Sequence, residues 1–185
     1  CYDEKWIIEN VRKACDLAVK YGNTHIRAFA DVDSKARLEG VKGVIRGREE
    51  YKDRLDIQVV AFPQDGVARE PGAKELIKQA MDLLGNVDLF VNCAGISHVG
   101  LITEESNEGW AEILDANLSS TFYCSRAIVP YMIREQKGRI LNISSVWGNV
   151  GASCEVAYSA TKGGINAFTK ALAKELAPSG IAVNA

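Results

Sequence analysis

A serine, a tyrosine and a lysine in the second half of the chain have the residue types and the spacing that could protonate a carbonyl. Tyr158 and Lys162 are four residues apart on a predicted helix, so their side chains lie on one face, within reach of a common ligand. An ammonium beside a phenol stabilises the phenolate, which makes a tyrosine a usable proton donor near neutral pH. Ser145 lies thirteen residues before Tyr158, just past a predicted strand, where its hydroxyl could hydrogen-bond a substrate carbonyl. Together, the three side chains could protonate a ketone.

Three further motifs accompany this set in a fixed order along the chain. Asn-Cys-Ala-Gly at 92–95 follows one predicted strand, Asn-Leu-Ser-Ser at 117–120 lies in the next helix, and Ile-Ser-Ser at 143–145 follows the next strand. A Tyr-x-x-x-Lys pattern alone arises often by chance, whereas the combination is specific. Residues from about 85 to 185 resemble the short-chain dehydrogenases/reductases, and in detail the 3-oxoacyl-carrier-protein reductase type.

This resemblance implies a role for each matching residue. Tyr158 would be the proton donor, and Ser145 would orient the carbonyl. Lys162 would hold the nicotinamide ribose and tune the tyrosine, while Asn117 would support the proton relay. The residues expected to lie along the cofactor are Asn92, Ala94 and Gly95. The alternative is that all of these residues are an inherited, non-functional scaffold that makes only local hydrogen bonds.

A glycine-rich turn for the diphosphate of a dinucleotide has no match in the sequence before Asn92. The backbone of such a turn approaches the pyrophosphate at a helix N-terminus, and the family carries it as Thr-Gly-x-x-x-Gly-x-Gly after its first strand. Gly40, Gly43 and Gly47 lie inside a predicted helix and do not follow a strand, so they are no substitute. We therefore expect no cofactor, or at most weak binding of NADP or NAD.

Two runs in the first half of the chain, at 24–33 and 57–66, carry a different resemblance. They are similar to cytosine-deaminase-type amidohydrolases, which are (β/α)8 barrels, and Gln64 matches the substrate-binding glutamine that contacts the pyrimidine there. The metal-binding histidines and aspartate of that family lie on barrel strands that this segment does not contain, so we exclude deamination. His25 and His98 have no neighbours at ligand spacing, so we expect no metal.

The two resemblances meet between Met81 and Val87, where both families have a helix that ends near a glycine, then a turn and a strand. We therefore expect an engineered chimera, a single α/β domain over 1–185 built from the segments 1–84 and 85–185. Its expected function is that of a scaffold without native catalytic activity, and so not that of an enzyme. The alternative is an impaired NAD(P)-dependent short-chain oxidoreductase that retains the Ser-Tyr-Lys residues and binds its cofactor weakly.

Short apolar segments alternate with amphipathic ones, which is typical of a parallel sheet with helices on both faces. The five predicted strands cover residues 25–32, 56–62, 87–91, 139–143 and 181–183. Five strands are too few to close a (β/α)8 barrel, so we expect an open doubly wound sheet, flavodoxin-like or Rossmann-like, in the order 2-1-3-4-5. A long helical region over 103–136 should bend or break at Pro130. The expected assembly is a monomer, with a swapped or edge-paired homodimer as the alternative.

Polar residues would gather at the carboxyl ends of these strands, where ligands bind in such sheets. They indicate either a residual site for a cation or small polar molecule, or a set of solvated loop caps. We favour caps, because aspartate and asparagine are common in such turns on local grounds alone. The residues concerned are Asp31, Asp33, Gln64, Asp65, Asn92 and Ser145.

The charge of the chain is nearly balanced. With 22 basic and 24 acidic residues the formal net charge is -2, so nothing favours nucleic acid or an anionic membrane as a partner. No apolar run approaches the roughly 20 residues of a membrane-spanning helix, and the first residues lack the pattern of a secretory signal. The five cysteines form no Cys-x-x-Cys pair, so we expect free thiols and a cytoplasmic protein.

Overall fold

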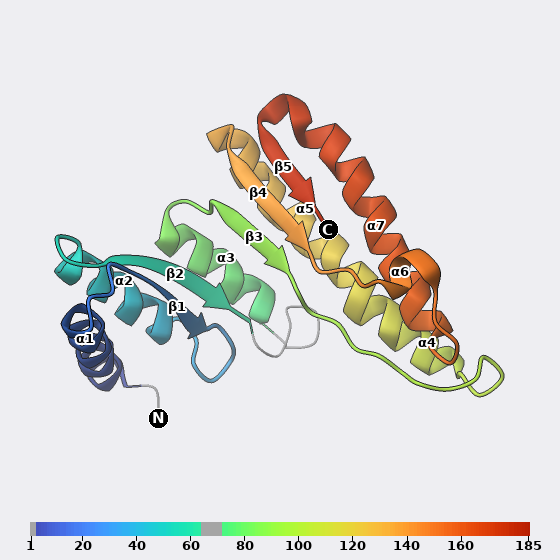
Figure 1. Ribbon diagram of the computed structural model, residues 1–185, viewed down its shortest axis with the longest axis horizontal. Coiled ribbons are helices and arrows are strands. Elements are labelled where there is room, and N and C mark those ends of the chain that lie inside the picture. The colour runs from blue at the N-terminus through green and yellow to red at the C-terminus, as the bar shows by residue number, and fades with distance from the viewer. Residues whose placement is uncertain (1–2, 64–71) are drawn as a thin grey trace. The chain divides into compact units, whose positions relative to one another are not determined.

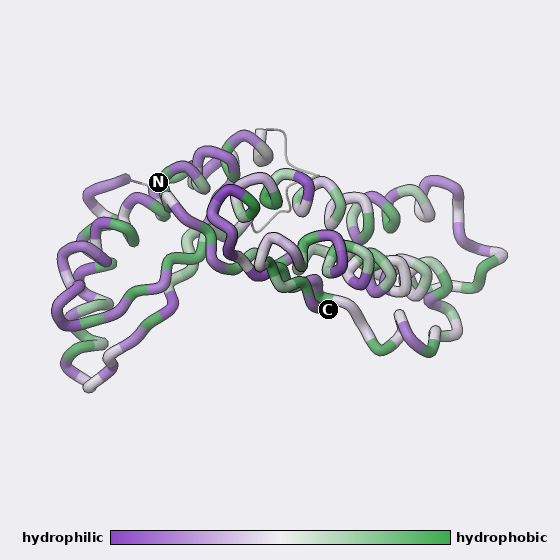
Figure 2. The backbone as a smooth tube through the Cα atoms, turned by 90° about the horizontal axis from the view of Figure 1, so that it is seen from above, coloured by the Kyte–Doolittle hydropathy of each residue, from purple (hydrophilic) through white to green (hydrophobic). Residues whose placement is uncertain are grey.

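The structure is a computed structural model that describes residues 3–63 and 72–185, in two compact units, Cys1–Asn86 and Val87–Ala185 (Figure 1). Within each unit every pair of neighbouring strands is parallel, and helices form the crossovers between them. Figure 2 shows hydrophilic and hydrophobic residues alternating along the helices, as expected for elements with one buried face. This arrangement confirms the predicted Rossmann-like α/β class.

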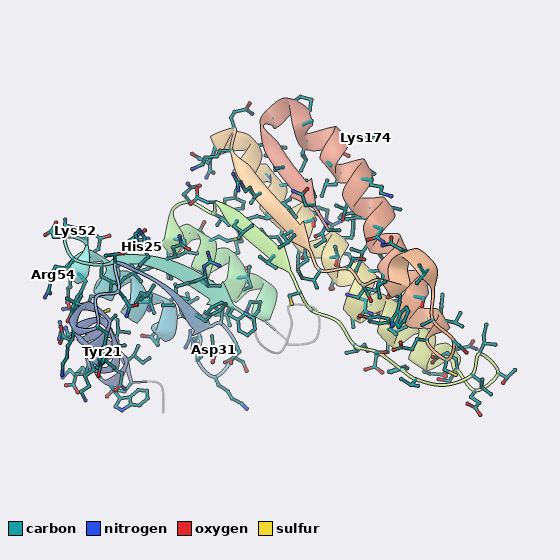
Figure 3. The ribbon with its side chains drawn as sticks, in the orientation of Figure 1. Tyr21, His25, Asp31, Lys52, Arg54 and Lys174 are labelled. Carbon is teal, nitrogen blue, oxygen red and sulfur yellow. The ribbon has the colours of Figure 1, made fainter. Side chains whose placement is uncertain are left out.

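The first unit pairs two strands and adds three helices. The strands are β1 (His25–Asp31) and β2 (Asp56–Phe62), and the helices are α1 (Glu4–Lys20), α2 (Glu39–Tyr51) and α3 (Ala73–Leu84). Figure 3 labels both ends of β1, where His25 pairs with Asp56 and Asp31 with Phe62. All five elements contribute to one hydrophobic core, which includes Cys15, Ala30, Val41, Ile57 and Ala80.

Two of the three glycines of α2 lie where this helix crosses α1. Gly43 and Gly47 are buried, and a Cβ at Gly43 would stand 2.5 Å from Cγ2 of Ile7. A Cβ at Gly47 would meet Cγ1 of Val11 at still closer range. Both neighbours are β-branched side chains with little rotational freedom in a helix, so neither can move aside easily. The two glycines therefore permit the close approach of two helices.

We expect Gly43→Ala to destabilise the protein by about 1–3 kcal/mol, because overpacking against Ile7 outweighs a gain of about 1 kcal/mol in helix propensity. Gly40→Ala is the matched control on the same helix, since a Cβ there would lie 3.4 Å from Cβ of Ala30, an ordinary contact. Urea unfolding followed by circular dichroism gives both free energies. A Gly43→Ala variant as stable as the Gly40→Ala variant would contradict the tight crossing.

The second unit has three strands in the order β3-β4-β5. The strands are β3 (Leu89–Asn92), β4 (Gly138–Asn142) and β5 (Ile181–Asn184). The other elements are α4 (Asn107–Leu114), the π-helix η1 (Asp115–Ser119), α5 (Ser120–Glu135), α6 (Trp147–Val150), α7 (Val156–Leu176) and the 3-10 turn η2 (Ala177–Ser179). Helix α5 contacts β3 and β4, while α7 contacts β5 (Figure 1).

The long helical region before β4 is interrupted at a different place from the one predicted. Helix α5 continues through Pro130 to Glu135 without a break. The irregular stretch is η1, in which Asp115–Ser119 form a π-helix between α4 and α5. Such single π-turns recur at functional sites, and this one carries the buried Asn117.

All five predicted strands are present, with β1 beside β2 and with β4 between β3 and β5. The predicted order 2-1-3-4-5 also requires β1 beside β3, and that adjacency stays a prediction. The single domain over 1–185 and the oligomeric state stay predictions too. Within the part of the chain that the structure describes, no helix is long and apolar enough to span a membrane.

Candidate active site

Lys162 on α7 is only 4% exposed, which is unusual for a lysine. Its Nζ donates to the main-chain oxygen of Ile143, just past β4, at 2.7 Å. Burial lowers the pKa of Lys162, and the nearby Cys93 raises it in part. The same Nζ lies 5.5 Å from the centroid of the Tyr158 ring. One turn of α7 thus brings the buried cation and the phenol together.

Ser145 lies half-buried in the segment between β4 and α6. Its Oγ accepts the N–H of Trp147 at 3.2 Å, and its main-chain oxygen accepts the N–H of Gly148 at 3.0 Å. The preceding Ser144 donates its hydroxyl to the main-chain oxygen of Lys162 at 3.2 Å. Together with the hydrogen bond from Nζ of Lys162 to the oxygen of Ile143, these contacts hold the segment that carries Ser145 beside the lysine.

Helix α6 approaches α7 backbone to backbone. A Cβ at Gly148 would lie 2.7 Å from the carbonyl carbon of Lys162 and 2.8 Å from its oxygen. A Cβ at Gly163 would in turn lie 3.3 Å from the oxygen of Gly148. Because the N–H of Gly148 is hydrogen-bonded to the main-chain oxygen of Ser145, this contact sets how far the serine lies from α7.

The turn at 92–95 passes beside the same lysine. A Cβ at Gly95 would lie 3.3 Å from Oδ1 of Asn117 and 3.5 Å from Nζ of Lys162. Asn92, at the start of the turn, donates its amide hydrogens to Oδ1 of Asn142 at 2.7 Å and to Oγ of Ser125 at 3.2 Å. The third residue expected along the cofactor, Ala94, is exposed.

Asn117 is fully buried in η1 and bonds the residue after the turn. Its Oδ1 accepts the N–H of Ile96 at 2.7 Å, and its Nδ2 donates to the oxygen of Ile96 at 2.9 Å and to Oγ1 of Thr161 at 3.1 Å. Its amide therefore closes the end of the turn and contacts the residue before Lys162. These contacts position the turn; a part in the proton relay stays a prediction.

The structure adds polar residues that the sequence did not single out. Asn142 is fully buried at the end of β4 and donates to Oγ1 of Thr169 at 2.8 Å. The only sequence signal for Asn142 is a polar residue at a core-facing position of an apolar strand. The hydroxyls of Ser125 and Thr169 give no local signal, because both residues occur within ordinary helical segments.

Asp33, one of the polar residues predicted at the strand ends of the first unit, behaves as a loop cap. Oδ1 of Asp33 accepts the N–H groups of Lys35 at 2.7 Å and of Ala36 at 2.6 Å, which favours a cap over a ligand site. The ring of His25 lies 2.8 Å from Oγ1 of Thr24. The described ranges contain no cluster of three metal-ligating side chains. Gln64, the predicted pyrimidine contact, and Asp65 lie outside the described residues.

The donor set around Lys162 fits the ribose of a nicotinamide nucleotide. An ammonium has three N–H donors, and the bond to Ile143 uses one of them. The hydroxyls of a ribose are suitable acceptors for the others, and Gly95 presents no side chain between the turn and Nζ. The residues at this end of the site are therefore compatible with a nicotinamide cofactor.

The sequence model of one family, described as short chain dehydrogenase, matches residues 32–185. The chain belongs to this family. A protein of known structure, acetoin dehydrogenase YohF from Salmonella typhimurium, is similar with a TM-score of 0.65 over 94% of this chain and 69% of that one. At 24% identity this similarity shows the fold alone.

Curated relatives match about two thirds of this chain. A 3-oxoacyl-[acyl-carrier-protein] reductase from Synechocystis sp. is 40% identical over 122 residues, which cover 66% of this chain and 49% of the relative. An uncharacterized oxidoreductase from Bacillus subtilis, YmfI, is 43% identical over the same shares of the two chains. The chain therefore spans about half the length of the curated relatives that it matches.

The interpretation as an engineered chimera with an amidohydrolase segment gains no support. The family match begins at residue 32 and runs through the predicted junction at 84 and 85. A barrel and an open sheet both repeat a short apolar strand followed by an amphipathic helix. Short runs such as 57–66 therefore cannot distinguish the two folds.

The expectations of a non-enzyme and of no cofactor are wrong. The matching family is described as a dehydrogenase, and the two relatives are named as a reductase and an oxidoreductase. Those expectations depended on the lack of a match to the glycine-rich turn before Asn92. The aligned part, however, is only about half the length of the matched relative. The residues that remain around Lys162 fit the nicotinamide end of the cofactor.

Proposed function

We propose that this chain carries the proton-transfer site of an NAD(P)H-dependent carbonyl reductase, with Ser145, Tyr158 and Lys162 acting on the carbonyl. The observation that supports it is the buried Lys162, whose Nζ lies 5.5 Å from the centroid of the Tyr158 ring. The same Nζ donates a hydrogen bond to the main-chain oxygen of Ile143, two residues before Ser145. No purely structural need calls for a lysine here, since an apolar side chain would fill the same space at lower cost in desolvation.

The three side chains have separate tasks in this proposal. A bound reduced nicotinamide would supply the hydride to the carbonyl carbon. Tyr158 donates its phenolic proton to the carbonyl oxygen, and the hydroxyl of Ser145 hydrogen-bonds that oxygen and orients it. The Oγ of Ser145 already accepts the N–H of Trp147, so its own hydrogen is available for the substrate.

Lys162 stabilises the charge that the tyrosine acquires. When Tyr158 gives up its proton, a phenolate remains close to the ammonium. For a phenolate oxygen that comes within about 5–6 Å of Nζ, the two unit charges attract by about 3 kcal/mol at an effective dielectric constant of about 20. That amount corresponds to a factor of about 100 in rate if it is realised only in the transition state.

The proposed substrate is a 3-oxoacyl thioester. The support is similarity: the Synechocystis protein, named as a 3-oxoacyl-[acyl-carrier-protein] reductase, is 40% identical over 122 residues. The carrier protein as the natural form of the thioester is part of the same proposal.

Cofactor binding is tested by thermal shift with NADPH and NADH. A ligand that binds only the folded state raises the melting temperature. At a ligand concentration of about 100 times Kd, it adds about 2.7 kcal/mol to the free energy of unfolding. We expect a shift for the wild type that is lost in Lys162→Met, which keeps the aliphatic chain but removes the donors. Lys174→Met, at an exposed lysine near the end of the same helix (Figure 3), should keep the shift. Equal shifts in both variants, or neither shift nor turnover of an acetoacetyl thioester by the wild type, would contradict the proposal.

A further inference from the structure

Four polar side chains form a connected set through the interior of the second unit. Asn92 donates to Ser125 at 3.2 Å and to Asn142 at 2.7 Å, and Asn142 donates to Thr169 at 2.8 Å. The set therefore joins the ends of β3 and β4 to the helices α5 and α7. We call Ser125, Asn92, Asn142 and Thr169 the polar chain.

The polar chain lies where apolar residues would be expected. Ser125 is 1% exposed, Asn142 0% and Thr169 5%, and the same three elements bury Ile128, Ile140 and Ile165 nearby in sequence. A buried amide or hydroxyl without a partner is costly, and one with a partner gains little over an apolar side chain. Fully bonded networks of this kind do specify one arrangement of the surrounding core, which makes positioning their evident contribution.

The polar chain ends on the turn that lines the cofactor end of the site. Both amide hydrogens of Asn92 are directed inward, and the main-chain oxygen of Asn92 accepts the N–H of Ile143 at 2.8 Å. The first residue of the turn is thus held through its side chain and its backbone. The residue after the turn, Ile96, donates its N–H to Oδ1 of Asn117 and accepts a hydrogen bond from Nδ2 of the same side chain. Between these two anchors, Gly95 is placed beside Lys162.

We propose that Thr169 is a positioning residue for the turn at 92–95, acting through Asn142 and Asn92. This inference rests on the proposed function only for the statement that the turn contacts a cofactor. Thr169 lies seven residues beyond Lys162 on α7. It does not belong to the set of side chains proposed to touch the cofactor or the carbonyl.

The hydroxyl of Thr169 supplies the buried acceptor for Nδ2 of Asn142. While Oγ1 of Thr169 accepts from Nδ2 of Asn142, Oδ1 of Asn142 must face Asn92 and can accept its hydrogen. Without that hydroxyl, Nδ2 of Asn142 loses its partner, and a flipped amide would place two N–H donors against each other. Neither orientation of the Asn142 amide is then fully bonded, so its hydrogen bond with Asn92 weakens and the start of the turn is held less firmly.

Thr169→Val and Thr169→Ser separate the hydroxyl from the shape of the side chain. Valine keeps the shape and removes the hydroxyl, whereas serine keeps the hydroxyl and removes a methyl group. We expect amide hydrogen exchange of the segment 92–96, in the protein without cofactor, to become about fivefold faster or more in Thr169→Val. Thr169→Ser should stay within about twofold of wild type. The affinity for NADPH should fall about tenfold in Thr169→Val, with a smaller change in kcat.

Ile165→Val controls for a general loss of stability. Ile165 is 1% exposed and lies one turn before Thr169, so this variant destabilises the same part of α7 without touching the polar chain. Exchange in 92–96 that is equal in Thr169→Val and Ile165→Val, at matched melting temperature, would overturn the inference. If no variant binds NADPH but exchange in 92–96 still rises only in Thr169→Val, the proposed function fails and the positioning role stands.

Discussion

Replacing Tyr158 with phenylalanine is expected to reduce kcat/KM for a 3-oxoacyl thioester by about a thousandfold, the middle of the range for loss of a positioned general acid. The substitution removes one oxygen and keeps the ring beside Lys162. Tyr158 is half-buried, and no hydrogen bond from its hydroxyl is found among the described residues. We therefore expect the free energy of unfolding to change by less than about 0.5 kcal/mol.

The measurement compares steady-state rates and melting temperatures of Tyr158→Phe with those of Tyr131→Phe. Tyr131 lies on α5 near Arg134, whose guanidinium carbon is 5.4 Å from the ring centroid, and it has no place in the proposed site. Its variant should keep wild-type kcat/KM. A loss of less than about tenfold in Tyr158→Phe, with a normal melt, would assign the proton to another donor.

Gly148→Ala is expected to have the second largest effect, a fall of about a hundredfold in kcat. The new Cβ would lie 2.7 Å from the carbonyl carbon of Lys162, and backbone atoms in the middle of α7 cannot move aside. Helix α6 must therefore shift, and Ser145 shifts with it, because its oxygen bonds the N–H of Gly148. A displacement of about 1 Å in a positioning group can cost about a hundredfold in rate. Overpacking should also cost about 1–3 kcal/mol in stability.

Two other glycines on α7 provide a graded control for this prediction. A Cβ at Gly163 would be 3.3 Å from the oxygen of Gly148, so Gly163→Ala should reduce kcat less than Gly148→Ala. A Cβ at Gly164 would meet the side chain of Leu118 at 3.0 Å, on the side that does not contact α6, so Gly164→Ala should leave kcat nearly unchanged. The rates are measured at saturating substrate, together with the melting temperature of each variant. Loss of kcat that follows the loss of stability across all three variants would argue against a specific effect on Ser145.

The strands were predictable because their signals are local. Apolar runs bounded by turn residues predict strands over 25–32, 56–62 and 139–143, and the structure has β1, β2 and β4 within a residue of these limits. The same local pattern misled at a larger scale, where the run at 57–66 suggested a barrel enzyme. An apolar strand followed by a helix satisfies either fold, and only the parts of the chain that surround it decide between them.

The interruption before β4 shows the limit of a single-residue signal. Proline at 130 predicts a bend or break because it removes one backbone donor and clashes with the preceding turn. Helix α5 tolerates it, and the irregular turn lies instead at η1, where the hydroxyl of Thr121 bonds the main-chain oxygen of Asn117. No single residue type predicts the π-turn here. The turn carries Asn117, whose hydrogen bonds join it to Ile96 and Thr161, and both of these residues are distant in sequence.

The amino-acid sequence by itself determined the set of residues that we propose to act on a carbonyl: a phenol and an ammonium four residues apart, and a serine at a strand end. These relations follow from helix periodicity and chain order, which act over a few residues. Only the tertiary structure decided what holds the set in place. Asn92 and Asn142 are fifty positions apart, and Lys162 meets Ile143 across nineteen. These hydrogen bonds form because parallel strands align their carboxyl ends and α7 packs beside them. Short-range patterns of residues do not predict that packing.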